Sequence, residues 1–185
     1  MLKFLEEKYP AKKFMRTNMS CHFMTLTLKK KQFLNQHPAF PKKTQVYLDK
    51  RKDININKFF YRQIGKEHYW RDRLIWSDKE WQKYIDNINL ETGVLKIEED
   101  LVGFFEQEHH KNKNEIELIQ MGILKNYQNK NLGSILLKFI INRAFSDDID
   151  RLWVHTCSLD HKYALNNYLS KGFKIFKEEV VNFEY

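Results

Sequence analysis

The chain has 185 residues, of which 42% are hydrophobic and 15% aromatic, and it carries a formal net charge of +8. This length and composition predict one globular domain with a sizeable core and exclude a disordered chain. No apolar run approaches the length of a membrane span, and Cys21 and Cys157 are too far apart for a disulfide-rich or metal-binding framework. The positive charge favours anionic partners, although a lysine-rich solvated surface accounts for it as well.

The first 23 residues are expected to form an N-terminal extension, and residues 24–185 a single domain. The segment up to His22 is basic and lacks a regular apolar pattern, so a loosely ordered, irregular backbone is expected there. Met1 and Met24 are alternative translation starts. Acidic residues interrupt the apolar run that an N-terminal signal peptide needs, so the protein is expected to be cytoplasmic.

Beyond residue 41 the chain contains no proline, which suits continuous strands and helices. Ser77 and Glu80 form a capping box that starts one helix, and Gly65 and Gly172 stand where two others are expected to end. The helix that begins at Leu132 is apolar around most of its circumference, which indicates burial. The apolar patterns predict, in chain order, a strand (44–51), two helices (53–64 and 77–85), three strands (92–97, 101–107 and 115–124), the helix from Leu132, a strand (151–158), a helix (163–170) and a strand (173–183).

A polar turn, Tyr127–Ser134, connects the strand that ends near Leu124 to the apolar helix. The first amides of a helix have no intrahelical partner, and with the positive end of the helix dipole they form a site for anions. Lys130 adds positive charge, while the small residues Gly133 and Ser134 let a ligand approach the backbone. The turn therefore predicts the binding of a phosphate-bearing ligand, although an ordinary polar helix start has a similar composition.

Two segments resemble the GNAT superfamily of acetyl-CoA-dependent N-acetyltransferases. Gln128–Gly133 is similar to its cofactor motif, Gln/Arg-x-x-Gly-x-Gly/Ala, and Ala164–Phe173 resembles its closing helix signature, Ala with Tyr four residues on and Gly-Phe four after that. The segments Leu152–His161 and Tyr69–Arg73 resemble a bacterial subgroup. The resemblance covers residues 44–179 and implies an α/β fold, with a mixed, mostly antiparallel, twisted sheet flanked by helices on both faces.

The resemblance implies that acetyl-CoA binds along the last strand before the turn and at the turn itself. Ile123 and Leu124 would pair with the pantetheine arm, with an amide near Ile123 polarising the thioester carbonyl, and His161 stands where the superfamily often has an asparagine near the cofactor. Asn129 and Asn131 replace common glycines; asparagine tolerates a positive φ, but its side chain can crowd a pyrophosphate and lower the affinity. The amides expected to hold the pyrophosphate belong to Gln128, Asn129, Lys130, Asn131, Leu132, Gly133 and Ser134.

The resemblance also implies direct attack of an amine on the thioester, which needs a base and a proton donor. Tyr168 matches the tyrosine that protonates the departing CoA thiolate; the alternative is a core tyrosine on an amphipathic helix. Glu117 is the expected base, with Glu115 in reserve, and His155 competes because imidazole titrates near neutral pH. Cys157 lacks a recognisable base and is expected to be a buried strand residue, not an acyl carrier.

The acceptor wall is expected near the first two helices, where Tyr69, Arg71 and Arg73 lie in an aromatic-rich segment. The arginines would bind an acidic acceptor, or they would pair with Asp72 and Asp78 while the aromatic residues build the core. The predicted activity is acetyl transfer from acetyl-CoA, without a metal, to a small amine or a protein or peptide amine, by a monomer or homodimer. A CoA-binding regulatory domain without turnover is the alternative. No recognised nucleic-acid motif is present, so neither specific nucleic-acid binding nor a membrane partner is expected.

Overall fold

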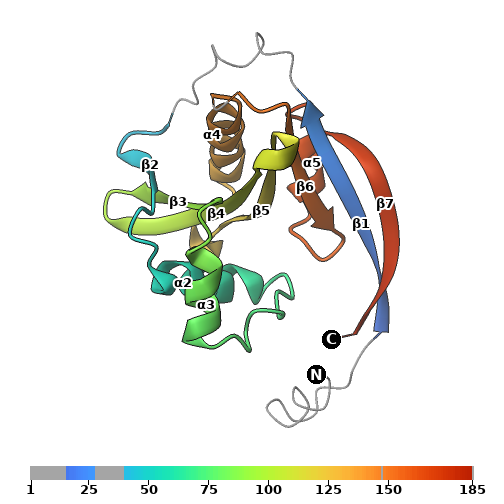
Figure 1. The fold of residues 1–185 in the computed structure, drawn as a ribbon, viewed down its shortest axis with the longest axis horizontal. Coiled ribbons are helices and arrows are strands. Elements are labelled where there is room, and N and C mark those ends of the chain that lie inside the picture. Colours follow the sequence, from blue (N-terminus) through green and yellow to red (C-terminus); the bar gives the residue numbers. More distant parts are fainter. Residues whose placement is uncertain (1–15, 28–39, 147, 185) are drawn as a thin grey trace.

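The computed structural model describes residues 16–27, 40–146 and 148–184. Its strands are β1 (Arg16–Thr27), β2 (Thr44–Leu48), β3 (Leu90–Ile97), β4 (Asp100–His110), β5 (Glu115–Ile123), β6 (Arg151–Cys157) and β7 (Lys174–Glu184). They form one seven-stranded sheet in the order β2-β3-β4-β5-β6-β1-β7 (Figure 1). β5 and β6 pair in parallel, and every other neighbouring pair is antiparallel.

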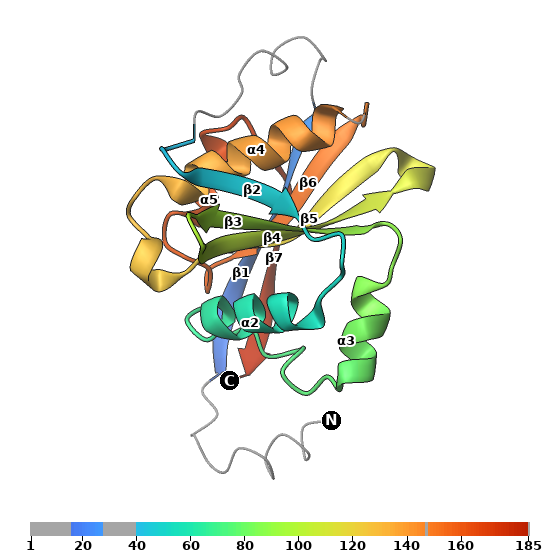
Figure 2. The same ribbon diagram turned by 90° about the vertical axis from the view of Figure 1, so that its left-hand side faces the viewer.

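Helices cover both faces of the sheet. They are α2 (Ile54–Gly65), α3 (Asp78–Ile85), α4 (Leu132–Ser146) and α5 (Ala164–Leu169), and α2 and α4 lie on opposite faces (Figure 2). The predicted capping box of Ser77 and Glu80 starts α3. The predicted α/β fold with a mixed, mostly antiparallel sheet is confirmed. Among the helices of the described ranges, none is long and apolar enough to cross a membrane.

The two faces carry separate hydrophobic clusters, because neighbouring residues of a strand point to opposite sides. On β3 and β4, Leu95 and Phe105 belong to the cluster of α4, whereas Val94 and Phe104 belong to the cluster of α2 with Phe60. The Phe60 and Phe104 rings stack with their centroids 4.9 Å apart. The predicted burial of α4 is confirmed; its buried residues are Leu132, Leu136, Leu137, Ile140, Ile141, Ala144 and Phe145.

Gly93 on β3 gives the buried ring of Phe105 its space, because a Cβ at this position would lie 2.0 Å from Phe105 Cε1. Gly93→Ala is therefore expected to lower the free energy of unfolding by about 1–3 kcal/mol, the usual cost of overpacking a core. Gly133→Ala is the matched control, because its Cβ would meet no atom nearer than 3.8 Å. Urea unfolding of both variants checks the prediction, and equal stabilities would contradict it.

Strand β1 enters the sheet between β6 and β7 and pairs antiparallel with both. The irregular backbone expected up to His22 is therefore wrong for residues 16–22. Apolar residues do not alternate regularly in this segment, so pairing on both sides determines its strand conformation more than the local pattern does. β1 crosses the expected boundary after residue 23, whereas residues 1–15 lie outside the described part of the chain. The division into an extension and a domain stays a prediction.

Candidate active site

Strands β5 and β6 diverge after a short parallel contact. Their pairing ends at Leu118 and Val154, although β5 continues to Ile123 and β6 to Cys157. A cavity of about 950 Å³ occupies the space between the diverging ends and is lined by residues of both strands. Residues 119–123 thus have no strand partner on the β6 side, and such an edge can bind an extended ligand through backbone hydrogen bonds.

β5 also contains a bulge where it leaves β6. Leu118 pairs with Gln107 of β4 and Gln120 pairs with Glu106, so Ile119 has no partner in that register. A bulge leaves its extra residue out of the ladder and redirects the backbone next to it. The irregular backbone of β5 therefore lies at Ile119, four residues before Ile123, near which the resemblance implies a polarising amide.

The last residues of β5 are bound to the sheet. Ile123 pairs with Gly103, and the Leu124 amide donates to the carbonyl oxygen of Val102 at 2.8 Å. The Leu124 amide is therefore not available for the expected pairing with a pantetheine arm. Leu124 packs against the cluster of α2 and lies outside the cavity lining, whereas Ile123 belongs to the lining.

The predicted anion-binding turn forms one edge of the cavity. Asn129 and Asn131 both have a φ of 60°, the left-handed conformation that asparagine was expected to tolerate. Within the described ranges, the amides of Leu132, Gly133 and Ser134 at the start of α4 donate no hydrogen bond. These amides and the helix dipole make this edge suitable for an anion.

Side-chain contacts hold the turn in place. Gln128 Nε2 donates to the Ile123 carbonyl oxygen at 3.2 Å, and the Tyr127 hydroxyl donates to Asp100 at 2.8 Å. The Lys130 ammonium lies 5.2 Å from the centre of the Tyr127 ring, and Lys130 does not line the cavity. The Gln128 amide, one of those expected to hold the pyrophosphate, instead donates to the Lys125 carbonyl oxygen at 3.2 Å. The first amides of α4 are the ones left for a ligand.

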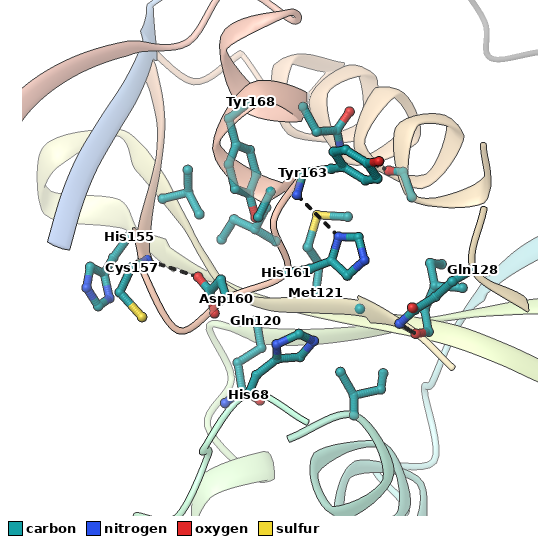
Figure 3. A pocket seen from close by; sticks show the side chains of 18 of the residues that line it. His68, Gln120, Met121, Gln128, His155, Cys157, Asp160, His161, Tyr163 and Tyr168 are labelled. Carbon is teal, nitrogen blue, oxygen red and sulfur yellow. Dashed lines mark hydrogen bonds between the residues drawn. The ribbon is translucent and has the colours of Figure 1, made fainter. Parts of the chain in front are cut away.

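Tyr168 on α5 lines the same cavity, and its hydroxyl end points into it (Figure 3). Its ring packs edge-on against Phe173, with the centroids 5.6 Å apart. Burial, with a contribution from Asp160, raises the pKa of the Tyr168 phenol, so the phenol keeps its proton at neutral pH. Gly172, predicted to stop the helix that contains Tyr168, follows α5 and has a φ of 92°, a conformation that favours glycine.

Two of the expected bases line the cavity, Glu117 on β5 and His155 on β6. Burial raises the pKa of the Glu117 carboxyl, and this outweighs the hydrogen bond from His110 Nε2 at 3.2 Å. Burial lowers the pKa of the His155 imidazole, which favours its unprotonated form at neutral pH. The reserve base, Glu115, is instead buried in an ion pair with Arg151 at 3.0 Å and does not line the cavity.

Asp160 is a cavity residue that the sequence analysis missed. Its Oδ2 accepts a hydrogen bond from the Thr156 hydroxyl at 2.7 Å. It also accepts one from the Cys157 amide at 3.0 Å (Figure 3). These bonds fix the loop that follows β6 and bring a carboxylate to the cavity. A signal was available, because an aspartate three residues after a strand end often bonds back to the backbone.

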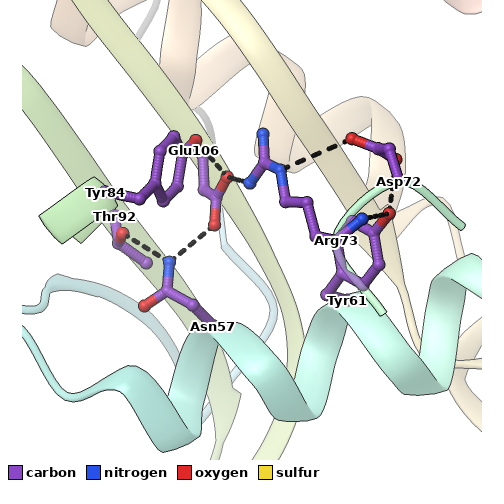
Figure 4. A network of polar contacts seen from close by, with 7 residues as sticks. All are labelled: Asn57, Tyr61, Asp72, Arg73, Tyr84, Thr92 and Glu106. Carbon is purple, nitrogen blue, oxygen red and sulfur yellow. Dashed lines mark hydrogen bonds and ion pairs between the residues drawn. The ribbon is translucent and has the colours of Figure 1, made fainter. Parts of the chain in front are cut away.

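Arg73 belongs to a buried polar network (Figure 4). Its Nη1 donates to Glu106 at 2.8 Å, and the same carboxylate accepts hydrogen bonds from Tyr84 at 2.7 Å and Asn57 at 2.6 Å. Burial alone would lower the pKa of Arg73, but Glu106 outweighs it and raises the pKa. The positive charge of Arg73 is thus compensated inside the protein, which argues against its expected role in binding an acidic acceptor.

The other arginine of this segment, Arg71, does not line the cavity, whereas Arg73 does. Arg71 lies over the ring of Tyr69, 5.3 Å from its centre, and only Tyr69 of the two lines the cavity. The alternative pairing of Arg73 with Asp72 is present at 3.9 Å, whereas Asp78 pairs with a lysine of α2. Arg73 is therefore engaged by Glu106, whereas Arg71 is exposed beside Tyr69, and its binding of an acidic acceptor stays a prediction.

The sequence matches the model of the acetyltransferase (GNAT) family over residues 57–173. The matched range contains the diverging strands, the turn before α4 and Tyr168, which together form the cavity. The chain belongs to the GNAT acetyltransferase family.

Solved structures of other GNAT proteins share this fold. An aminoglycoside acetyltransferase from an uncultured soil metagenomic sample, in complex with trehalose, is 17% identical with a TM-score of 0.62, covering 80% of this chain and 98% of that chain. The structure of its complex with sisomicin is 17% identical with a TM-score of 0.61, and the match covers 77% of this chain and 95% of that chain. A GCN5-related N-acetyltransferase from Sphaerobacter thermophilus is 11% identical with a TM-score of 0.66, covering 98% of this chain and 54% of that chain. A search of curated proteins found no match.

The cavity of this GNAT protein brings together most of the predicted site residues. All of them line it except Leu124, Lys130, Arg71 and the reserve base Glu115. His161 lies there next to His68, with ring centroids 6.2 Å apart, and burial lowers the pKa of His161. His68 was missed because it lies in an irregular connection without a motif. Within the described ranges, His, Cys, Asp and Glu form no group suited to a metal ion.

Proposed function

We propose that this GNAT protein transfers an acetyl group from acetyl-CoA to a primary amine by direct attack on the thioester. The observation that carries the proposal is the meeting of the unpaired edge of β5 with the amide-rich start of α4 in one cavity. A ligand with an amide-containing arm and a pyrophosphate suits this arrangement, because the arm can pair with a strand edge and the pyrophosphate with a helix start.

The residues at the cavity fit acetyl-CoA, which supplies an activated acetyl group when bound. The amides of Leu132, Gly133 and Ser134 would hold the pyrophosphate, and residues 119–123 would hold the pantetheine arm. Asn129 and Asn131 reach the required left-handed backbone without glycine. Glycine is therefore not needed at these positions for the turn to form. The crowding expected from the asparagine side chains would lower the affinity for acetyl-CoA.

In this proposal Tyr168 gives its proton to the departing thiolate, and Glu117 removes a proton from the amine. The raised pKa of Tyr168 supports the first role, because the phenol is protonated when the thiolate leaves. The raised pKa of Glu117 supports the second, because it makes the carboxylate a stronger base. His155 remains the competing base, and the oligomeric state and the cytoplasmic location stay predictions from sequence.

A panel of five amines tests the proposal: sisomicin, spermidine, tyramine, L-lysine and a short peptide with an unblocked N-terminus. CoA release is measured for each amine with acetyl-CoA, and the products are identified by mass spectrometry. Formation of an N-acetylated product from at least one amine is the expected result. Tight CoA binding in calorimetry with no product from any amine would favour the alternative, a CoA-binding regulatory domain.

The pH dependence of kcat/KM should identify the base. A base works when deprotonated, so activity should rise with pH through the raised pKa of Glu117 and level off above it. Glu117→Gln is expected to remove this rise and lower kcat/KM by about 10²–10⁴-fold. His155→Gln is the matched comparison, and if it removes the rise while Glu117→Gln retains it, His155 is the base.

A further inference from the structure

Gln120 carries a buried polar atom without a partner at the cavity. Its Oε1 is inaccessible to solvent and has no hydrogen-bond donor among the residues that the structure describes. A buried acceptor that lacks a donor costs about 1–3 kcal/mol. Gln120 is only partly buried and lines the cavity, so a rotation of its side chain would offer this acceptor to a molecule that fills the cavity.

The position of Gln120 separates it from the other buried polar atoms of this kind. In the described ranges these atoms are Thr44 Oγ1, Asn57 Oδ1, Asn89 Oδ1, Gln107 Oε1, Gln120 Oε1 and Trp153 Nε1. Of these residues, Gln120 is the one that lines the cavity, directly after the bulge in β5. Figure 3 places its side chain beside His68.

Alternation along β5 puts Gln120 on the face of α2, opposite to the face of α4. A Cβ on Gly122 would lie 2.7 Å from Ile64 of α2, so position 122 faces α2, and position 120 faces the same way. Met121 between them packs against the cluster of α4. The anion-binding turn leads into α4, so Gln120 faces the part of the cavity that lies away from the expected CoA site.

The neighbours of Gln120 do not use its amide oxygen. Its partner on β4, Glu106, is a carboxylate and already accepts hydrogen bonds from Asn57, Arg73 and Tyr84. The arginine nearest to this region, Arg73, donates to Glu106. The amide oxygen of Gln120 is thus an uncharged acceptor on a wall whose neighbouring charges are paired.

We propose that Gln120 binds the acceptor substrate, with its Oε1 accepting a hydrogen bond from the amine N–H. This inference rests on the proposed function and names a residue for its second substrate. A neutral amide holds the amine without the strong preference for the ammonium form that a carboxylate would have. The amine can therefore lose its proton to the base while it stays bound.

Two variants of matched shape test the inference with the amine of the panel that gives the highest kcat/KM. Gln120→Met is expected to raise the KM for the amine about 3- to 10-fold, the loss of one hydrogen bond, and to leave the KM for acetyl-CoA unchanged. Gln107→Met is the control, because Gln107 also has a buried, unpartnered Oε1 on the neighbouring strand but does not line the cavity. It is expected to change neither KM.

A third variant adds a readout that a purely structural role would not change. Gln120→Glu places a carboxylate at the bound amine, which stabilises the ammonium form and should shift the rise of kcat to higher pH. An unchanged KM for the amine in Gln120→Met, an equal rise in both KM values, or an unshifted pH profile in Gln120→Glu would each overturn the inference. If the wild-type protein acetylates no amine of the panel, the proposed function itself fails, which is a separate result.

Discussion

Arg73→Met is expected to lower the free energy of unfolding by about 3–5 kcal/mol. The substitution removes the guanidinium and leaves the Glu106 carboxylate buried without a compensating charge. Tyr84 and Asn57 would still donate hydrogen bonds to Glu106, but neither carries a positive charge. Urea unfolding followed by circular dichroism measures the loss.

The double variant Arg73→Met with Glu106→Gln separates the charge from the packing. It removes both charges, so it should recover a large part of the stability lost in the single variant. The surface pair Lys96–Glu99, 3.0 Å apart, provides the control, and Lys96→Met should change stability by less than about 1 kcal/mol. Equal losses for Arg73→Met and Lys96→Met would show that the buried pair is not required for stability.

Tyr168→Phe is expected to lower kcat by about 10²–10⁴-fold, the usual contribution of a positioned proton donor. The change removes one hydroxyl and keeps the ring that packs against Phe173. The affinity for CoA should therefore stay close to that of the wild type. Steady-state kinetics with the fastest amine of the panel, together with calorimetry of CoA binding, checks both expectations.

Tyr47→Phe is the control for this prediction, since Tyr47 lies on β2 outside the cavity lining. It should leave kcat unchanged. A single-turnover measurement is needed as well, because slow product release would hide an effect on chemistry. An unchanged single-turnover rate in Tyr168→Phe would remove this residue as the proton donor.

Local signals predicted the features that depend on neighbours in sequence. Ser77 and Glu80 form the expected capping box, and Gly172 has the positive φ expected after a helix. Asn129 and Asn131 adopt the left-handed backbone that their side chains tolerate. In each case the physical cause lies within a few residues, so the sequence contains it.

Features that depend on distant partners were not predicted. The bulge at Ile119 follows from the register with β4, and the pairing of Arg73 with Glu106 joins segments that lie 33 residues apart. The unpartnered Oε1 of Gln120 also depends on which side chains surround it in the folded protein. Periodicity and motifs describe a residue's own element, and they do not specify its neighbours across a sheet.

The position of β1 has a consequence for the order of folding. β6, one wall of the cavity, pairs with β5 only from Arg151 to Val154 and with β1 over its whole length. β1 is synthesised before the other strands of the sheet and its partners β6 and β7 after them, so β1 must await them while the intervening strands are made. Pairing across such a sequence distance has a high loop-closure entropy and slows folding. The cavity wall is therefore completed late, and until then β1 exposes backbone groups on which chaperones or aggregation can act.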